Sequence, residues 1–259
     1  MNRWALVLTY HAIERGPAPL CVDPRLFREH LDCLAEAGAR TLTVSELAAS
    51  LRAGDLSEPA VTLTFDDGFA SVADEAAPLL VERGLTATVF CVAGYVGRMN
   101  DWPSQPAGRP QRPLASVEQL AGLAEAGFEI GSHGLEHAPL DGAAEQVLRR
   151  EIVESRAVLE SMLGVRVSSF AYPYGALPEV PGRLLVAEEY TSACTTTIGR
   201  TQPGCHLQAL PRVDVHYLRR PELLRRAVAG ALDSYLSVRR VAARGRRALR
   251  KDYAQAGHA

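Results

Sequence analysis

The stretch Val61-Thr-Leu-Thr-Phe-Asp-Asp-Gly68 joins an apolar, β-branched run to two adjacent carboxylates and a glycine. The run predicts a buried β-strand that stops before Gly68, because β-branched and aromatic residues favour strands. Asp66 and Asp67 do not suit a core, since two unpaired carboxylates are costly to bury. We therefore expect both at a strand end that faces a cleft, where a cation holds one carboxylate and leaves the other free.

Strand-like and helix-like segments alternate around this stretch. The strand candidates are Ala5–Thr9, Val61–Phe65, Thr86–Val92, Phe128–Gly131, Ser168–Tyr172, Ser192–Thr197 and Leu207–Val213. The helix candidates are Pro24–Ala37, Val44–Ala53, Phe69–Arg83, Val117–Ala126, Ala143–Leu163 and Arg183–Glu189. Such alternation predicts βαβ units and a parallel sheet, which either closes into a barrel or stays open and doubly wound.

The composition suits one large α/β domain. The chain has 259 residues, of which 47% are hydrophobic and 22% charged, enough to bury a substantial core. Its five cysteines are scattered without a C-x-x-C pair, which argues against a disulfide scaffold and a structural zinc knot. The apolar stretch from Trp4 to Leu8 is too short for a signal segment, so we expect a cytoplasmic protein.

The second chemical motif is His133-Gly-Leu-Glu-His137. Two imidazoles and one carboxylate form a ligand set for Zn²⁺ or a similar divalent metal. Taken separately, the acidic doublet also fits a plain turn, and the two histidines also fit a solvated surface. Gly131, Gly134 and Pro139 disfavour a helix and favour a loop that leaves a strand.

A third motif, Phe170-Ala-Tyr-Pro-Tyr-Gly175, follows a later strand candidate. In parallel α/β folds, function gathers at the carboxyl ends of the strands, and all three motifs fall at such ends. Together they closely resemble the polysaccharide deacetylase family, the metal-dependent carbohydrate esterases that share the NodB homology domain. The resemblance runs from Leu8-Thr-Tyr-His11 to about His216. It implies a distorted (β/α) barrel of seven strands and a catalytic domain over residues 1–218.

The resemblance also implies roles for the motif residues. Asp67, His133 and His137 would hold the metal, with Zn²⁺ favoured and Co²⁺, Ni²⁺ or Mn²⁺ as alternatives. Asp66 would be the general base, and Tyr174 would offer its backbone N–H to the oxyanion. The substrate contacts that we predict come from Tyr172, Pro173 and His11.

Two positions depart from the family pattern. Ala171 stands where the third motif often has an arginine that pairs with the base, so we hypothesise that Arg212 supplies that cation to Asp66. Gly134 stands where the second motif usually has serine or threonine, which predicts the loss of a hydrogen bond that fixes the loop.

The general acid implied by the resemblance is a late histidine. His216 lies in Leu210-Pro-Arg-Val-Asp-Val-His216, at a predicted strand end, and is our candidate. Asp214 could orient its imidazole or pair with Arg212. The alternatives are that His216 is a surface histidine and that His11, which ends the first strand, reaches the cleft instead.

The C-terminal part, residues 219–259, is basic. Between Arg219 and Lys251 there are eleven basic and two acidic residues, which leaves a charge of −11 for the rest of the chain. Leu223–Lys251 has helical spacing, and a basic amphipathic helix is a candidate for docking on an anionic membrane. We favour instead a terminal helix that packs one face on the domain. Nucleic acid is not an expected partner, because aromatic residues do not interleave with the basic ones.

The proline-rich stretch Arg98–Pro113 is the most loop-like of the chain, and we interpret it as an insertion rather than an ordered lid. The function that the resemblance implies is removal of N-acetyl groups from N-acetylhexosamine units of a glycan, or of a lipid-linked glycan precursor. The alternatives are a hydrolase of another small amide and a catalytically inactive glycan-binding homologue.

Overall fold

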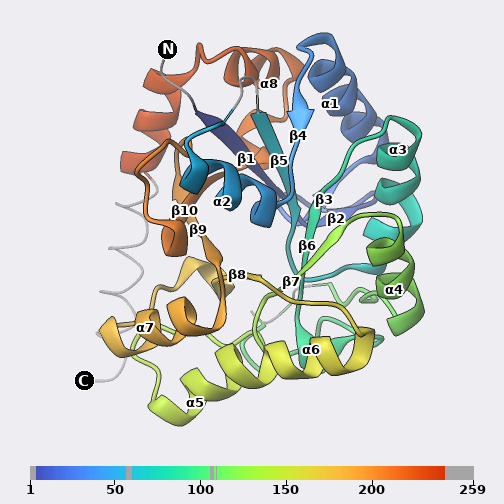
Figure 1. Ribbon diagram of the computed structural model, residues 1–259. Coiled ribbons are helices and arrows are strands. Elements are labelled where there is room, and N and C mark those ends of the chain that lie inside the picture. Colours follow the sequence, from blue (N-terminus) through green and yellow to red (C-terminus); the bar gives the residue numbers. More distant parts are fainter. Residues whose placement is uncertain (1–3, 57–59, 106–107, 109, 243–259) are drawn as a thin grey trace.

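Seven parallel strands close into a ring in the computed structural model, which describes residues 4–56, 60–105, 108 and 110–242 (Figure 1). The ring consists of β1 (Ala5–Tyr10), β5 (Ala60–Phe65), β6 (Thr88–Cys91), β7 (Glu129–Ser132), β8 (Ser169–Ala171), β9 (Ser192–Ile198) and β10 (Leu210–Asp214). It closes because β1 pairs with both β10 and β5. Of the two predicted arrangements, the barrel is therefore confirmed. A short β4 (Arg40–Thr41) also pairs with β5, and β2 (Ala12–Ile13) pairs with β3 (Cys21–Val22).

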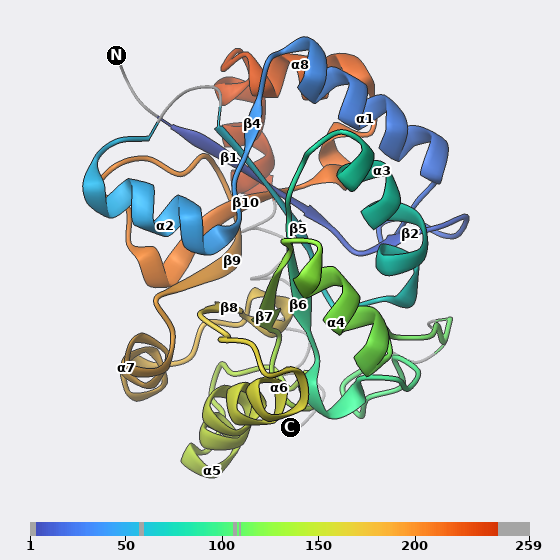
Figure 2. The same cartoon turned by 45° about the vertical axis from the view of Figure 1, so that its right-hand side comes forward.

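Helices surround the ring (Figures 1 and 2). They are α1 (Pro24–Glu36), α2 (Val44–Ala53), α3 (Ala77–Glu82), α4 (Val117–Glu125), α5 (Glu145–Arg149), α6 (Ser155–Leu163), α7 (Val180–Glu189) and α8 (Pro221–Val228). Two predicted helices contain a wider π-helical turn, at Val72–Ala76 before α3 and at Arg150–Glu154 between α5 and α6. Helix α4 begins with a capping box formed by Ser116 and Gln119.

The strand β5 delivers the acidic doublet to the carboxyl end of the barrel. All six of its residues are buried, and its register aligns Phe65 with Tyr10 of β1. The ladder continues one residue further, because Asp66 N–H donates to the Tyr10 carbonyl at 2.9 Å. Asp67 and Gly68 then take positive φ angles of 73° and 75°, which turn the chain out of the sheet.

The C-terminal part is not one long helix within the described residues. Helix α8 ends before Gly230, whose φ is +77°, and a second helix covers residues 233–242. Leu224, Val228, Leu232 and Leu236 are buried, and α8 packs against α1 (Figure 1). The arginines at 244, 246, 247 and 250 and Lys251 lie outside the described residues. Membrane docking and a cytoplasmic location therefore stay predictions. In the described part of the chain, no helix has the length and apolarity needed to cross a membrane.

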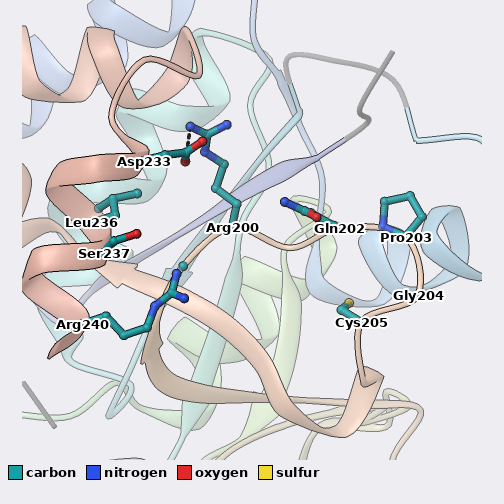
Figure 3. Close-up of a pocket in the computed structure, with 10 residues that line it drawn as sticks. Arg200, Gln202, Pro203, Gly204, Cys205, Asp233, Leu236, Ser237 and Arg240 are labelled. Atoms are coloured by element: carbon teal, nitrogen blue, oxygen red, sulfur yellow. Dashed lines mark ion pairs between the residues drawn. The ribbon is translucent and has the colours of Figure 1, made fainter.

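A pocket of about 480 Å³ lies between this second helix and the loop after β9 (Figure 3). Thr201 in that loop pairs with Ala5 at the amino end of β1, so the pocket lies at the end of the barrel opposite Asp66. Its arginines already have partners. Arg200 pairs with Asp233 and donates to the Gly230 carbonyl, while Arg240 donates to the Ile198 carbonyl. These contacts fasten the C-terminal helix to the barrel.

Candidate active site

The structure brings the three predicted metal ligands together. The Asp67 carboxylate lies 3.5 Å from Nε2 of His133 and 3.3 Å from Nε2 of His137. One ligand atom from each residue lies within 4.8 Å of the others, and all three residues are buried. One carboxylate oxygen and two imidazole nitrogens at this separation can converge on a single divalent ion. The prediction that these residues form one cluster is therefore confirmed.

The ring of His133 has the tautomer that a metal ligand needs. Its Nδ1 lies 2.7 Å from the Ala171 carbonyl, which can only accept, so the proton is on Nδ1 and Nε2 keeps its lone pair. Burial lowers the pKa of His133 to about 4, although the Asp66 carboxylate opposes this shift. The imidazole is therefore neutral at neutral pH. Both properties fit a divalent cation next to Asp67.

The backbone is strained at three places in the site. Asp67, His137 and Tyr174 have φ angles of 73°, 57° and 56°, and they are the non-glycine residues with positive φ in the described part of the chain. Such conformations cost of order 1–3 kcal/mol each and persist where the surroundings enforce them. Their concentration on two predicted metal ligands and the predicted oxyanion residue indicates that the fold maintains this geometry for a function.

The second carboxylate, Asp66, is held by Arg212. The guanidinium makes two parallel bonds to it, from Nη1 to Oδ1 at 2.7 Å and from Nη2 to Oδ2 at 2.8 Å. Arg212 is also held by the Thr195 carbonyl at 3.0 Å and the Thr64 hydroxyl at 3.2 Å. Arg212, a residue of strand β10, thus contacts Asp66 as hypothesised, in place of the arginine that Ala171 replaces.

This pair sets the protonation state of Asp66. Burial favours the neutral acid, but the bidentate Arg212 guanidinium outweighs it and holds the pKa of Asp66 well below its usual range. Asp66 is therefore ionised at neutral pH and can accept a proton.

Glu151 fixes the loop that carries the two histidines, and the sequence pattern did not reveal this role. Its buried carboxylate accepts from the backbone N–H groups of Leu135 at 3.0 Å, Glu136 at 3.0 Å and Ala138 at 3.3 Å. Burial raises the pKa of Glu151, while these donors oppose the shift. The hydrogen bond that we expected to be lost with Gly134 is thus replaced by three bonds to a carboxylate from the π-helical turn.

The structure also explains why residue 134 is glycine. Its φ is +86°, and a Cβ there would overlap Oε2 of Glu151. We predict that Gly134→Ser, although it restores the residue usual in the family, lowers the free energy of unfolding by about 1–3 kcal/mol more than a positive φ alone would, because the added side chain displaces Glu151. Urea denaturation measures this loss. Gly142→Ser is the matched control, because Gly142 has a φ of +74° but no atom within 4 Å of an added Cβ. Equal losses in the two variants would contradict the role given to Glu151.

The third motif forms a turn beside the cluster. Tyr174 is partly exposed, and its ring edge lies against His137 with centroids 4.5 Å apart. Tyr172 is fully buried, and its hydroxyl donates to the Gln208 carbonyl at 3.0 Å. Pro173 is also buried. The side chain of Tyr172 therefore supports the turn from inside the protein and offers no surface for the substrate contact that we predicted.

The two candidate acids are placed differently. His11 directly follows Tyr10, the last residue of β1, whose carbonyl accepts from Asp66 N–H, so its backbone lies next to the acidic doublet. Its Nδ1 is buried without a hydrogen-bond partner among the described residues. His216 is exposed, in the 3-10 turn Val215–Leu218. The Asp214 carboxylate accepts from the backbone N–H of His216 at 2.8 Å and does not hold its imidazole.

The proline-rich stretch is ordered against the site over its described residues 98–105. Trp102 is 2% exposed, and its ring stacks on His137 with centroids 4.5 Å apart. The interpretation of residues 98–113 as an insertion rather than an ordered part of the site is therefore wrong for the described residues 98–105. The stretch is ordered here because burial of the large apolar Trp102 side chain anchors a segment that is otherwise rich in proline and polar residues.

Comparisons with known proteins agree with the motifs. A family model described as polysaccharide deacetylase matches residues 53–191. YxkH of Bacillus subtilis (strain 168), a polysaccharide deacetylase by name, is 28% identical over 81% of this chain and 70% of its own length. The poly-beta-1,6-N-acetyl-D-glucosamine N-deacetylase of Staphylococcus epidermidis is 26% identical over 67% of this chain, which spans 65% of that relative.

The fold leads to the same relatives. The solved structure of IcaB from Ammonifex degensii superposes with a TM-score of 0.72 and 26% identity, covering 88% of this chain and 97% of that chain. The family model covers more than half of the chain, and the barrel and the three motifs agree with it. The chain therefore belongs to the polysaccharide deacetylase family and is an enzyme of the N-deacetylase class.

Proposed function

We propose that this protein is a metal-dependent hydrolase that removes N-acetyl groups from N-acetylhexosamine units of a polysaccharide. The observation that carries the proposal is the buried cluster of Asp67, His133 and His137 next to an ionised Asp66 that Arg212 holds in place. The relatives that act on poly-beta-1,6-N-acetyl-D-glucosamine make β-1,6-linked N-acetylglucosamine the first substrate to test.

Each step of amide hydrolysis then has a residue. A divalent cation held by the cluster would acidify a water molecule and polarise the acetyl carbonyl. Asp66 takes the proton of the attacking water, because Arg212 keeps its carboxylate ionised at neutral pH and therefore able to accept a proton. The backbone N–H of Tyr174 donates to the oxyanion of the tetrahedral intermediate, a contact worth about 3–4 kcal/mol in comparable sites.

His11 is our proposed general acid for the leaving amine. It follows Tyr10, whose carbonyl accepts from Asp66 N–H, whereas no described contact joins the exposed His216 to the cluster. We expect His11→Gln to lower kcat by about 10²-fold or more, and His216→Gln to change it little. A large loss with His216→Gln alone would return the role to His216. Rates of acetate release at saturating substrate compare the two variants.

Acetate release from β-1,6-linked N-acetylglucosamine oligosaccharides tests the activity itself. We expect release by the purified protein, its loss after treatment with a chelator, and its return with Zn²⁺, Co²⁺, Ni²⁺ or Mn²⁺. Binding of the oligosaccharide without release would favour an inactive glycan-binding protein. Release from small non-sugar amides alone would favour the other hydrolase. Release that is insensitive to chelation would contradict the metal site.

A further inference from the structure

We propose that Trp102 and Ser104 are positioning residues that hold the metal ligand His137 and join it to Tyr174. The proposal rests on the metal site proposed above and deepens it, because it assigns a task in that site to the proline-rich loop. Neither residue belongs to the three motifs that identify the family.

The ring of His137 is enclosed by two aromatic side chains. The indole of Trp102 stacks on it with centroids 4.5 Å apart and an interplanar angle of 27°. The ring of Tyr174 meets it edge-on at 4.5 Å and 80°. Trp102 is itself fixed by Tyr95, whose ring packs against it at 5.7 Å and 89°. Stacking on one side and an edge contact on another leave the imidazole little freedom to rotate about χ2.

This enclosure replaces a hydrogen bond that metal-ligating histidines usually make. Such a histidine normally donates its second ring nitrogen to a carbonyl or carboxylate, which fixes the orientation of the ring. His133 follows this rule through the Ala171 carbonyl. His137 does not, because its Nδ1 is buried without a hydrogen-bond partner among the described residues. The aim of its Nε2 toward Asp67 therefore depends on the aromatic contacts.

Ser104 fixes the backbone where Trp102 fixes the ring. Its hydroxyl donates to the His137 carbonyl at 2.7 Å, at a residue whose φ of +57° is unfavourable for a side chain. The Tyr174 hydroxyl donates to the Ser104 carbonyl at 2.9 Å. One serine thus connects a predicted metal ligand to the predicted oxyanion residue, and both have strained backbones.

The loop has its own anchor near its base, so it can hold other residues in place. Asn100 is buried, and its side-chain carbonyl accepts from Arg112 N–H at 2.6 Å, while its own N–H donates to the Arg112 carbonyl at 3.0 Å. These bonds tie the outgoing and returning arms of the loop together. The segment that carries Trp102 and Ser104 therefore contacts His137 from a part of the loop that hydrogen bonds hold in place.

Metal binding to the full chain tests the proposal without any substrate. We expect Trp102→Ala to weaken Zn²⁺ binding by about 10–100-fold in isothermal titration and to shift the ligand-field bands of the Co²⁺-loaded protein. Trp102→Phe, which keeps an aromatic face, should restore most of the affinity. Ser104→Ala should weaken binding by about three- to tenfold, the loss of one hydrogen bond. Trp4→Ala is the matched control, since Trp4 packs on Arg200 at the opposite end of the barrel.

The outcomes separate this proposal from the proposed function. If the Trp102→Ala protein is less stable without metal, yet binds Zn²⁺ as the wild type does with unchanged Co²⁺ bands, the role is only packing and the proposal falls. If that variant does not fold, Ser104→Ala decides, and wild-type affinity and bands in it would overturn the proposal. If the wild type binds no divalent metal, the proposed function fails first.

Discussion

Asp66→Asn should lower kcat for acetate release by about 10²–10⁴-fold while Zn²⁺ affinity stays close to that of the wild type. The amide has no useful basicity, so the attacking water loses its proton acceptor. The cluster of Asp67, His133 and His137 remains, and it does not include Asp66. Steady-state rates on the oligosaccharide and Zn²⁺ titrations of the same preparation measure the two effects separately.

The variant also changes stability, which the experiment must account for. Asp66 is the carboxylate partner of a buried Arg212, so its removal leaves a guanidinium charge with an amide partner only. A thermal unfolding curve of the Zn²⁺-loaded variant must therefore show that the variant is folded at the assay temperature. Only then are its rates compared with those of the wild type. Asp233→Asn controls for the loss of a carboxylate that pairs with an arginine, because Asp233 pairs with Arg200 far from the cluster; its side chain is 72% exposed, so its stability loss should be smaller. Retention of more than a tenth of the wild-type kcat in Asp66→Asn would exclude Asp66 as the base.

The sequence predicts a parallel sheet and the position of the doublet because those depend on local patterns, whereas closure into a barrel was implied only by the family resemblance. The run before Asp66 is apolar and β-branched, and every residue of β5 is buried. Alternation of strands and helices predicts parallel strands, and the carboxyl ends of parallel strands lie at one end of a barrel. The convergence of Asp67, His133 and His137 follows from that topology and needs no knowledge of side-chain packing.

What the sequence does not predict depends on contacts between distant segments. Glu151 reaches the histidine loop from a π-helical turn, and no spacing rule links it to Gly134. Trp102 lies in a segment whose composition indicates a loop, and only its burial against His137 shows that the loop belongs to the site. The tail pattern predicts one helix, whereas Gly230 divides it, because a positive φ breaks a helix that spacing alone continues.

Arg212→Gln should lower the free energy of unfolding by about 3–5 kcal/mol, the usual cost of removing one partner from a buried ion pair. Arg212 is 2% exposed, and Asp66 would keep a charge without its bidentate partner. The glutamine amide can replace at most part of the hydrogen bonding. Urea denaturation of the chelator-treated protein at neutral pH measures the loss.

The pH dependence of this loss identifies its cause. In the wild type, Arg212 holds the pKa of Asp66 below that of the unfolded chain, so the pair stabilises the fold above that unfolded value and the contribution is lost as the pH falls through the folded pKa. In Arg212→Gln, burial dominates and raises the pKa of Asp66 above its unfolded value. The stability difference between the two proteins should therefore be largest at neutral pH. It should begin to shrink as the pH falls through the raised pKa of Asp66 in the variant, and shrink further below about 4, where the wild-type pair loses its contribution.

The raised pKa of Asp66 in Arg212→Gln should also change the pH dependence of the reaction rate. A base with a raised pKa is protonated earlier as the pH falls, so the acid limb of kcat/KM should move to higher pH in Arg212→Gln than in the wild type. Arg200→Gln is the matched control, because Arg200 also pairs with an aspartate and has a side chain that is only 7% exposed, at the other end of the barrel. That control should lose stability and keep the wild-type pH profile. If both variants keep that profile, Arg212 only supports the fold, and the protonation state of Asp66 is set by the metal and the nearby histidines.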